Sequence, residues 1–130
     1  MVGIVLISHS SGLAAGAAEL VGQIAAGARV VPAGGTDDGR LGTSTERIAA
    51  AIATADTGDG VLLVPDMGSS VLSALALLAD LDPESSGKRV RLADAPFVEG
   101  AVAAAVAASG GLDLTAVATA AEEARDVRKL

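Results

Sequence analysis

The polar residues that could do chemistry fall into two short clusters, and each cluster directly follows an apolar run. His9-Ser10-Ser11-Gly12 follows the first run, and Asp66-Met67-Gly68-Ser69-Ser70 follows the third. An imidazole with one ring nitrogen bonded to a carboxylate keeps its other nitrogen free as a nucleophile. Serine hydroxyls, glycine and the free N–H groups of a helix start together suit a phosphate group. The pattern therefore indicates reversible phosphorylation of His9, with Asp66 as its partner.

Composition restricts the possible chemistry to this one imidazole. The 130 residues include one histidine and no cysteine. These counts exclude disulfides, a thiol nucleophile, Cys-ligated zinc, iron–sulfur clusters and multi-His metal sites. The formal net charge is −7 and Phe97 is the single aromatic residue. Nucleic acid and anionic membranes are therefore poor partners, since they require a basic face, and single-stranded nucleic acid also requires stacking rings.

A simpler interpretation gives the two clusters no chemistry. His9 and Asp66 could be ordinary polar residues at strand ends, with Ser10 and Ser69 serving as helix caps. Another acidic pair, Asp37-Asp38, fits a solvated turn better than a metal site, because no further carboxylates share its segment. The choice between a phosphorylation site and plain strand ends depends on where the fold places the clusters.

Strands and helices alternate along the chain around these clusters. Apolar and β-branched runs predict strands at Val2–Ile7, Arg29–Pro32, Val61–Val64 and Arg89–Leu92. Helices are expected after Ser10, from Ser44 or Thr45 to about Thr54, after Gly68, and from Phe97 onward with a break near Ser109-Gly110-Gly111. This alternation predicts one α/β domain over residues 1–130, with helices on both faces of an open, mainly parallel, four-stranded sheet.

The expected strand order, 2-1-3-4, is what would bring the clusters together. In that order the first and third strands are neighbours, and ligands of open parallel sheets bind beyond the carboxyl ends of such strands. His9 and Asp66 would then face each other across one crevice. Loops are expected at Ala33–Thr45 and Asp82–Gly87, where glycine, proline and acidic residues gather.

Two helices carry apolar positions that we expect to face the core. In the first helix these positions are Leu13, Ala17, Leu20, Val21 and Ile24. In the helix after Gly68 they are Val71, Leu72, Leu75, Leu78 and Ala79. Both sets recur at helical spacing, which is typical of an amphipathic helix that packs on a sheet.

The sequence does not predict a signal peptide or a membrane-spanning helix. Residues 1–18 carry no formal charge apart from a possible charge on His9, but the polar segment Ser8–Gly12 interrupts the apolar run. A second uncharged stretch, Gly100–Leu112, is shorter than the roughly 20 residues that a spanning helix needs. We therefore expect a cytoplasmic protein.

Five sequence blocks resemble a known family. They are Val5–Ser11, Ala33–Asp38, Leu41–Ser44, Asp66–Ala74 and Ala95–Gly100. Together they resemble the enzyme IIA domain of the mannose-type phosphotransferase system superfamily, and more closely the phosphotransferase subunits of bacterial dihydroxyacetone kinases. The blocks keep their order and rough spacing from residue 2 to about residue 105. The chain departs from the family in a short loop between Asp38 and Gly42 and at Ser44, which leaves the roles of Arg40 and Ser44 open.

The resemblance implies a phosphoryl carrier. His9 would accept a phosphoryl group from the phosphorylated histidine phosphocarrier HPr and pass it to ADP held on a DhaL subunit. Dihydroxyacetone on a DhaK subunit would be the final acceptor. The resemblance also implies that Asp66 orients His9 and that the chain forms a homodimer. It implies a phosphate pocket lined by Ser10, Ser11, Gly35, Thr43, Met67, Gly68 and Ser69.

Other functions remain open on the sequence. The same histidine chemistry would serve the enzyme IIA of a mannose-type sugar permease, which hands its phosphoryl group to an enzyme IIB. A non-catalytic regulatory module with a flavodoxin-like fold is the other alternative, although a receiver domain would need an acidic pair where this chain has Ser8-His9. No cofactor is expected, because no Walker lysine follows a glycine-rich loop.

Overall fold

A four-stranded parallel sheet carries the fold, with the order β2-β1-β3-β4 that the sequence predicts. The structure is a computed structural model that describes residues 1–81 and 89–130. Its strands are β1 (Gly3–Ser8), β2 (Arg29–Gly34), β3 (Val61–Pro65) and β4 (Val90–Leu92). All three strand pairs are parallel. The expected loop at Asp82–Gly87 lies outside the described residues.

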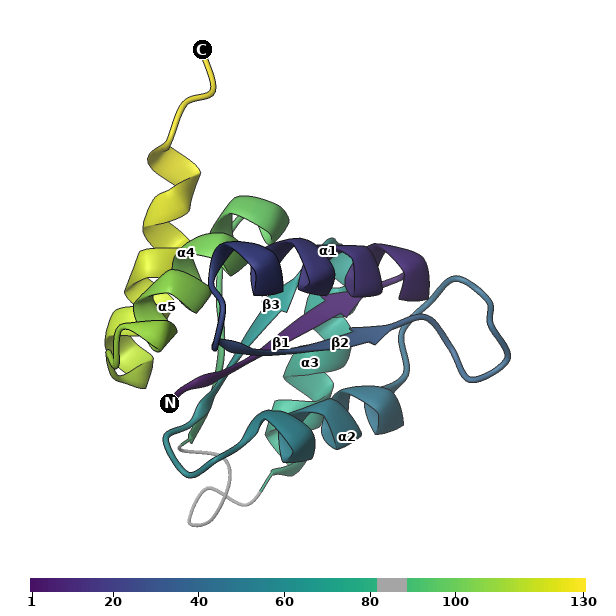
Figure 1. The fold of residues 1–130 in the computed structure, drawn as a ribbon. Helices are drawn as coiled ribbons and strands as arrows, with labels where there is room; N and C mark the ends of the chain where they lie inside the picture. Colours follow the sequence, from purple (N-terminus) through teal and green to yellow (C-terminus); the bar gives the residue numbers. More distant parts are fainter. Residues whose placement is uncertain (82–88) are drawn as a thin grey trace.

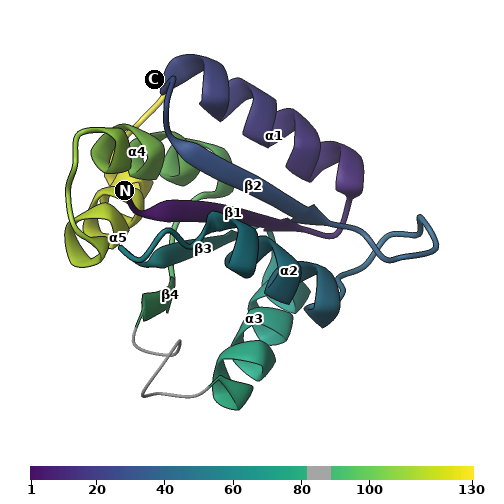
Figure 2. The ribbon, with the colours of Figure 1, turned by 60° about the horizontal axis from the view of Figure 1, so that its bottom comes forward.

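Helices cover both faces of this sheet, which confirms the predicted α/β class (Figure 1). The helices are α1 (Ser11–Ile24), α2 (Thr45–Ala55), α3 (Gly68–Asp80), α4 (Phe97–Ser109) and α5 (Leu114–Glu123), followed by the short 3-10 helix η2 (Ala124–Asp126). Figure 2 shows α1 and α4 on one side of the sheet and α2 and α3 on the other. No helix in the described parts of the chain is both long and apolar enough to cross a membrane.

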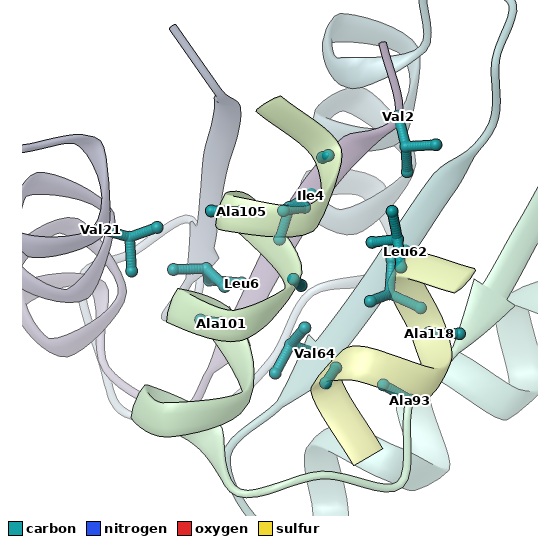
Figure 3. Close-up of a cluster of buried hydrophobic side chains, with 14 of the residues drawn as sticks. Val2, Ile4, Leu6, Val21, Leu62, Val64, Ala93, Ala101, Ala105 and Ala118 are labelled. Atoms are coloured by element: carbon teal, nitrogen blue, oxygen red, sulfur yellow. The ribbon is translucent and has the colours of Figure 1, made fainter. Parts of the chain in front are cut away.

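Strand β1 is buried along its whole length, because it lies in the middle of the sheet with a core on each face. Val2, Ile4 and Leu6 join one core with α1, α4 and α5, while Val5 and Ile7 join the other with α2 and α3. The first core is built around small side chains on α4 (Figure 3). The fully buried alanines of this helix are Ala101, Ala104, Ala105 and Ala108. Their size lets the helix backbone approach the sheet, so the core fills without aromatic rings.

The buried face of α1 differs from the expected one. Its buried residues are Ala14, Ala17 and Val21, whereas three of the residues that we expected in the core are about half exposed. Those three are Leu13, Leu20 and Ile24. Helical periodicity treats alanine and leucine alike as apolar. The apolar residues of α1 therefore allow two different helix faces to be the buried one. The close contact with the sheet selects the face with the smaller side chains.

Helix α3 also buries a different face from the one expected. The residues that it buries completely are Ser70 and Ala74, while Val71 and Leu78 are half-buried. Leu72, Leu75 and Ala79 are exposed, so their expected place in the core is wrong. The buried position of Ser70 is not an apolar position at all. It belongs to a polar site at the start of the helix.

A close approach between β2 and α1 fixes the segment that carries His9. A Cβ atom on Gly34 would lie 2.4 Å from the carbonyl oxygen of Ser10 and 2.8 Å from the Cβ of Ala14. The variant Gly34→Ala must therefore push the start of α1 away from the sheet. Such overpacking destabilises a protein by about 1–3 kcal/mol, and denaturant unfolding would measure the loss.

Gly16→Ala provides the matched control for that measurement. Gly16 lies within α1, and an added Cβ there would meet nothing within 4 Å. Because alanine favours helix over glycine, this variant should be more stable than the wild type, by roughly 0.5–1 kcal/mol. Equal unfolding midpoints for Gly34→Ala and the wild type would show that β2 and α1 tolerate a wider separation.

Candidate active site

The two polar clusters meet at the carboxyl ends of the central strands. His9 follows β1 directly and Asp66 follows β3, and these strands pair in parallel with Ile7 opposite Pro65. The N–H of Asp66 donates to the carbonyl of Ile7 at 2.9 Å, which extends the pairing by one residue. The expected meeting of His9 and Asp66 is thus a consequence of the strand order.

Asp66 holds His9 by both its ring and its backbone. The ring atom Nδ1 lies 3.0 Å from Oδ1 of Asp66, and the backbone N–H of His9 donates to Oδ2 at 3.1 Å. The imidazole is 20% exposed and the carboxylate 7% exposed, so the carboxylate is shielded while the ring reaches the surface. A carboxylate against Nδ1 fixes the proton on that nitrogen and leaves a lone pair on Nε2.

Three further donors converge on the same carboxylate. Ser70 Oγ donates to Oδ1 at 2.6 Å, Met67 N–H donates to Oδ1 at 2.7 Å, and Ser8 Oγ donates to Oδ2 at 2.9 Å. Burial by itself raises the pKa of Asp66, but hydrogen bonds from Ser70, the His9 N–H, Ser8 and the His9 ring outweigh it and lower that pKa to about 2. Asp66 is therefore an anion at neutral pH.

This low pKa makes folding stability depend on pH in the acid range. Because the Asp66 carboxyl binds its proton more weakly in the folded chain than in the unfolded chain, its contribution is complete above about pH 5 and is lost as the pH falls toward 2. The loss amounts to about 2 kcal/mol. Denaturant unfolding at pH 6, 4 and 2.5 would measure it. An Asp66→Asn variant should lack this part of the pH dependence, and an identical profile in that variant would contradict the assignment.

The other ring nitrogen of His9 faces the start of α3. Ser69 Oγ contacts Nε2 directly. Met67 is the N-cap residue of this helix and makes no side-chain capping bond. Free N–H groups at a helix start bind anions. Ser69 is thus placed beside Nε2, and Met67 and Gly68 precede it at the start of the helix. The phosphate-binding role expected for these three residues remains a prediction.

The start of α1 is organised differently. Ser10 Oγ accepts from the Leu13 N–H at 3.1 Å, and the Ser10 N–H donates to Ser8 Oγ at 3.0 Å. Ser10 is therefore a helix cap, and Ser11 is the exposed first residue of the helix. Both residues lie next to His9 in the chain, but the Ser10 hydroxyl already has a backbone partner. The phosphate-binding role expected for Ser10 and Ser11 remains a prediction.

The loop between β2 and α2 is fastened to the site at three points. The N–H of Gly35 donates to the carbonyl of Ser8 at 3.1 Å, and the N–H of Gly42 donates to that of His9 at 2.8 Å. Thr43 Oγ1 lies 2.5 Å from Ser73 Oγ on α3. Gly35 has a positive φ of 74°, and a Cβ atom added there would lie 3.3 Å from Ser11. Gly35 and Thr43, both expected to bind phosphate, here hold the loop beside His9.

The charged residues of this loop form ion pairs at the surface, one within the loop and one with α2. Asp38 pairs with Arg40 at 3.3 Å, and Asp37 pairs with Arg47 at 2.8 Å. Ser44, whose role was open, is the N-cap of α2 and accepts from the Arg47 N–H. In the described residues no three histidine or acidic side chains are grouped so that they could hold a metal ion. The acidic pair is part of an exposed turn, in agreement with its interpretation from the sequence.

Sequence reasoning missed Ser8 and Ser70 as members of the site. Both are fully buried, and both donate to Asp66. Two signals pointed to them. Ser8 is a polar residue at the end of a fully apolar strand, and Ser70 lies four residues after Asp66, within the first turn of α3. By residue type alone, Ser8 ends the apolar run and Ser70 belongs to a helix start.

Comparisons with known proteins match this geometry to one family. Residues 3–118 match the family described as EIIA-man, PTS system fructose IIA component. The chain is 41% identical over 121 residues to the phosphoryl donor subunit DhaM of the PEP-dependent dihydroxyacetone kinase of Escherichia coli. That match covers 90% of this chain but 25% of the relative, so the chain spans about a quarter of that protein's length.

Two further relatives match over most of their own length. The phosphoryl donor subunit DhaM of dihydroxyacetone kinase 2 from Listeria innocua is 41% identical over 107 residues, which cover 82% of this chain and 85% of the relative. A crystal structure of a protein of unknown function, EF1359, superposes with a TM-score of 0.83 at 36% identity, over 93% of this chain and 92% of that one. The similarity therefore extends over nearly the whole fold, including the segments that carry His9 and Asp66.

Proposed function

The chain belongs to the EIIA-man family, and on that premise we propose that it is the phosphoryl carrier of a dihydroxyacetone kinase, phosphorylated on His9. Phosphorylated HPr is the donor, and ADP bound to a DhaL subunit is the acceptor. The ATP formed there phosphorylates dihydroxyacetone on a DhaK subunit. The observation that carries the proposal is the Nδ1–Asp66 contact, which leaves Nε2 of the single histidine as a nucleophile at the surface.

The first transfer uses the lone pair on Nε2. This nitrogen attacks the donor's phosphorus, a new P–N bond forms, and the P–N bond to the donor imidazole breaks. The proton on Nδ1 stays in place, and the Asp66 carboxylate stabilises the positive charge that the ring gains. Ser69 and the free N–H groups at the start of α3 can donate to the phosphoryl oxygens. Phosphoryl transfer needs mainly such positioning and charge stabilisation.

The second transfer reverses these events with a different acceptor. A terminal phosphate oxygen of ADP attacks the phosphorus, so a P–O bond forms and the bond to Nε2 breaks. The imidazole returns to its starting state, with the proton still on Nδ1. Asp66 must therefore stabilise the phosphorylated ring without making it too stable to give up its phosphoryl group. Because several donors share the negative charge of Asp66, the carboxylate stabilises the phosphorylated ring only moderately.

The surroundings of this domain are also part of the proposal. We treat residues 1–130 as one enzyme IIA domain, because both cores pack on a single sheet. The proposed partners, HPr and the two kinase subunits, place the protein in the cytoplasm.

The exposed leucines of α1 and α3 are consistent with a homodimer. Light scattering at micromolar concentration should give twice the 12.6 kDa chain mass, and the monomer mass would refute the dimer.

The enzyme IIA of a sugar permease is the second candidate, because the matching family is described as a fructose IIA component of the phosphotransferase system. Both candidates share the phosphorylated histidine and differ in the acceptor. The test presents phosphorylated protein to DhaL loaded with ADP and, in parallel, to a mannose-type enzyme IIB. Formation of ATP with DhaL supports the kinase role. Transfer to enzyme IIB alone supports the permease role.

A further inference from the structure

Two polar side chains lie fully inside the described part of the structure, and both belong to the shell of Asp66. They are Ser8 and Ser70, each with no exposed surface. Burying a hydroxyl is unfavourable unless it is hydrogen-bonded. Both hydroxyls do bond to Asp66, but only Ser70 reaches the imidazole as well. Its Oγ lies 3.2 Å from Nδ1 of His9 and 2.6 Å from Oδ1 of Asp66.

Ser70 has a single hydroxyl proton, and where that proton points decides whether Ser70 is a donor or an acceptor toward the imidazole. A serine hydroxyl has one proton to donate and two lone pairs that accept. Asp66 is ionised and can only accept, so the Ser70 proton points to Oδ1 at the shorter of the two distances. Toward Nδ1 the Ser70 oxygen therefore presents a lone pair. Nδ1 thus faces two acceptors, Asp66 Oδ1 and Ser70 Oγ, and it must carry the proton to bond with either.

We propose that Ser70 is a positioning residue that fixes His9 in the Nδ1–H tautomer and so leaves Nε2 free to accept a phosphoryl group. Its importance for transfer rests on the proposed function, but the tautomer is a property of the unphosphorylated protein. In a free imidazole the proton favours Nε2, which would block the nucleophile. A second acceptor beside Nδ1 strengthens the preference that Asp66 establishes.

Ser8 gives a matched comparison for this role. Its hydroxyl donates to Oδ2 of Asp66, on the oxygen that bonds the His9 backbone, whereas the ring bonds to Oδ1. Replacing either serine with alanine removes one donor from the same carboxylate. Only the Ser70 replacement also removes an acceptor from Nδ1. Losing the Ser70 donor leaves Oδ1 a stronger acceptor for the Nδ1 proton, so a change toward the Nε2–H tautomer that occurs in Ser70→Ala alone reports the direct contact of Ser70 with the ring.

The experiment is ¹⁵N NMR of the imidazole in protein labelled at histidine, at a pH where the ring is neutral. His9 is the only histidine, so both ring signals belong to one residue. In the wild type we expect a pyrrole-like Nδ1 and a pyridine-like Nε2. In Ser70→Ala the ratio of the two tautomers should move toward Nε2–H by roughly fivefold, the effect of one ordinary hydrogen bond. In Ser8→Ala the ratio should stay close to that of the wild type.

The outcomes separate this inference from the proposed function. Unchanged ring shifts in a folded Ser70→Ala variant, or equal shifts in both variants, would overturn the role of Ser70 even if HPr phosphorylates His9. A tautomer change specific to Ser70→Ala would support it, even if HPr does not phosphorylate the protein. Far-UV circular dichroism and an unfolding curve establish that each variant is folded. The rate of labelling by phosphorylated HPr, a separate measurement, should fall about 2–10-fold in Ser70→Ala.

Discussion

Replacing His9 with alanine is expected to abolish labelling by phosphorylated HPr, from about one phosphoryl group per chain to background. The chain has no other imidazole and no thiol. Ser69 is the nearest hydroxyl to the reacting nitrogen, but without the ring it has no base to take its proton. The measurement is incorporation of radiolabelled phosphate, followed by mapping of the labelled residue. The label should be stable in base and lost in acid, as expected for phosphohistidine.

His9→Gln is the control for folding in that experiment. Its amide can donate to Asp66 as the ring does, so the buried carboxylate keeps a side-chain partner. The variant should therefore fold like the wild type and still take up no label. Labelling of either variant at the wild-type level would show that His9 is not the carrier, and the proposed function would be wrong.

Asp66→Asn is expected to reduce the rate of phosphoryl transfer by a factor on the order of 10²–10⁴, the range in which a misplaced tautomer slows a histidine-dependent reaction. Each oxygen of Asp66 accepts a backbone N–H, from His9 at Oδ2 and from Met67 at Oδ1. An asparagine amide has one oxygen, so either orientation turns its NH₂ group toward a backbone donor. One orientation also makes the side chain donate to Nδ1, which moves the ring proton to Nε2. Rapid-quench kinetics with phosphorylated HPr would measure the loss.

The same replacement should also cost stability, by about 1–3 kcal/mol at pH 7, because the backbone N–H of either His9 or Met67 loses its acceptor at the site. Asp38→Asn is the matched control. Asp38 also accepts two hydrogen bonds and has a lowered pKa, through the Thr36 hydroxyl and the Arg40 N–H, but it lies exposed on the loop. We expect this control to transfer and unfold nearly as the wild type does. Wild-type transfer by Asp66→Asn would remove Asp66 from the mechanism.

The parts of the fold that could be predicted from sequence are those set by local composition. Continuous apolar, β-branched runs identified the buried strands, and the strand order then placed His9 beside Asp66. The buried faces of α1 and α3 could not be predicted. Periodicity counts alanine and leucine alike, while the distance between helix and sheet selects the smaller residue.

The side-chain pairs of the site could not be predicted from the sequence for a different reason. The partner of Thr43 is Ser73, 30 residues away, and Ser70 meets a histidine 61 residues away. Such pairs depend on the rotamers and distances that the finished fold provides, not on neighbouring residue types. A serine at a helix start is also a common cap, as Ser10 is, so the spacing of Ser70 from Asp66 fits a simple cap as well as a partner of the carboxylate.

The donors that converge on Asp66 come from separate pieces of the chain: the end of β1, the junction with α1, the junction with α3, and α3 itself. Through them the carboxylate acts as a non-covalent cross-link that closes a loop from residue 8 to residue 66. If one of these segments opens locally, the ionised Asp66 carboxylate loses a donor, and the bonds that hold the other segments to it weaken as well. We therefore expect the segments to open together. Amide hydrogen exchange at His9 and Met67 should then report a single cooperative unit. The imidazole would then lie on a part of the surface whose segments open only together.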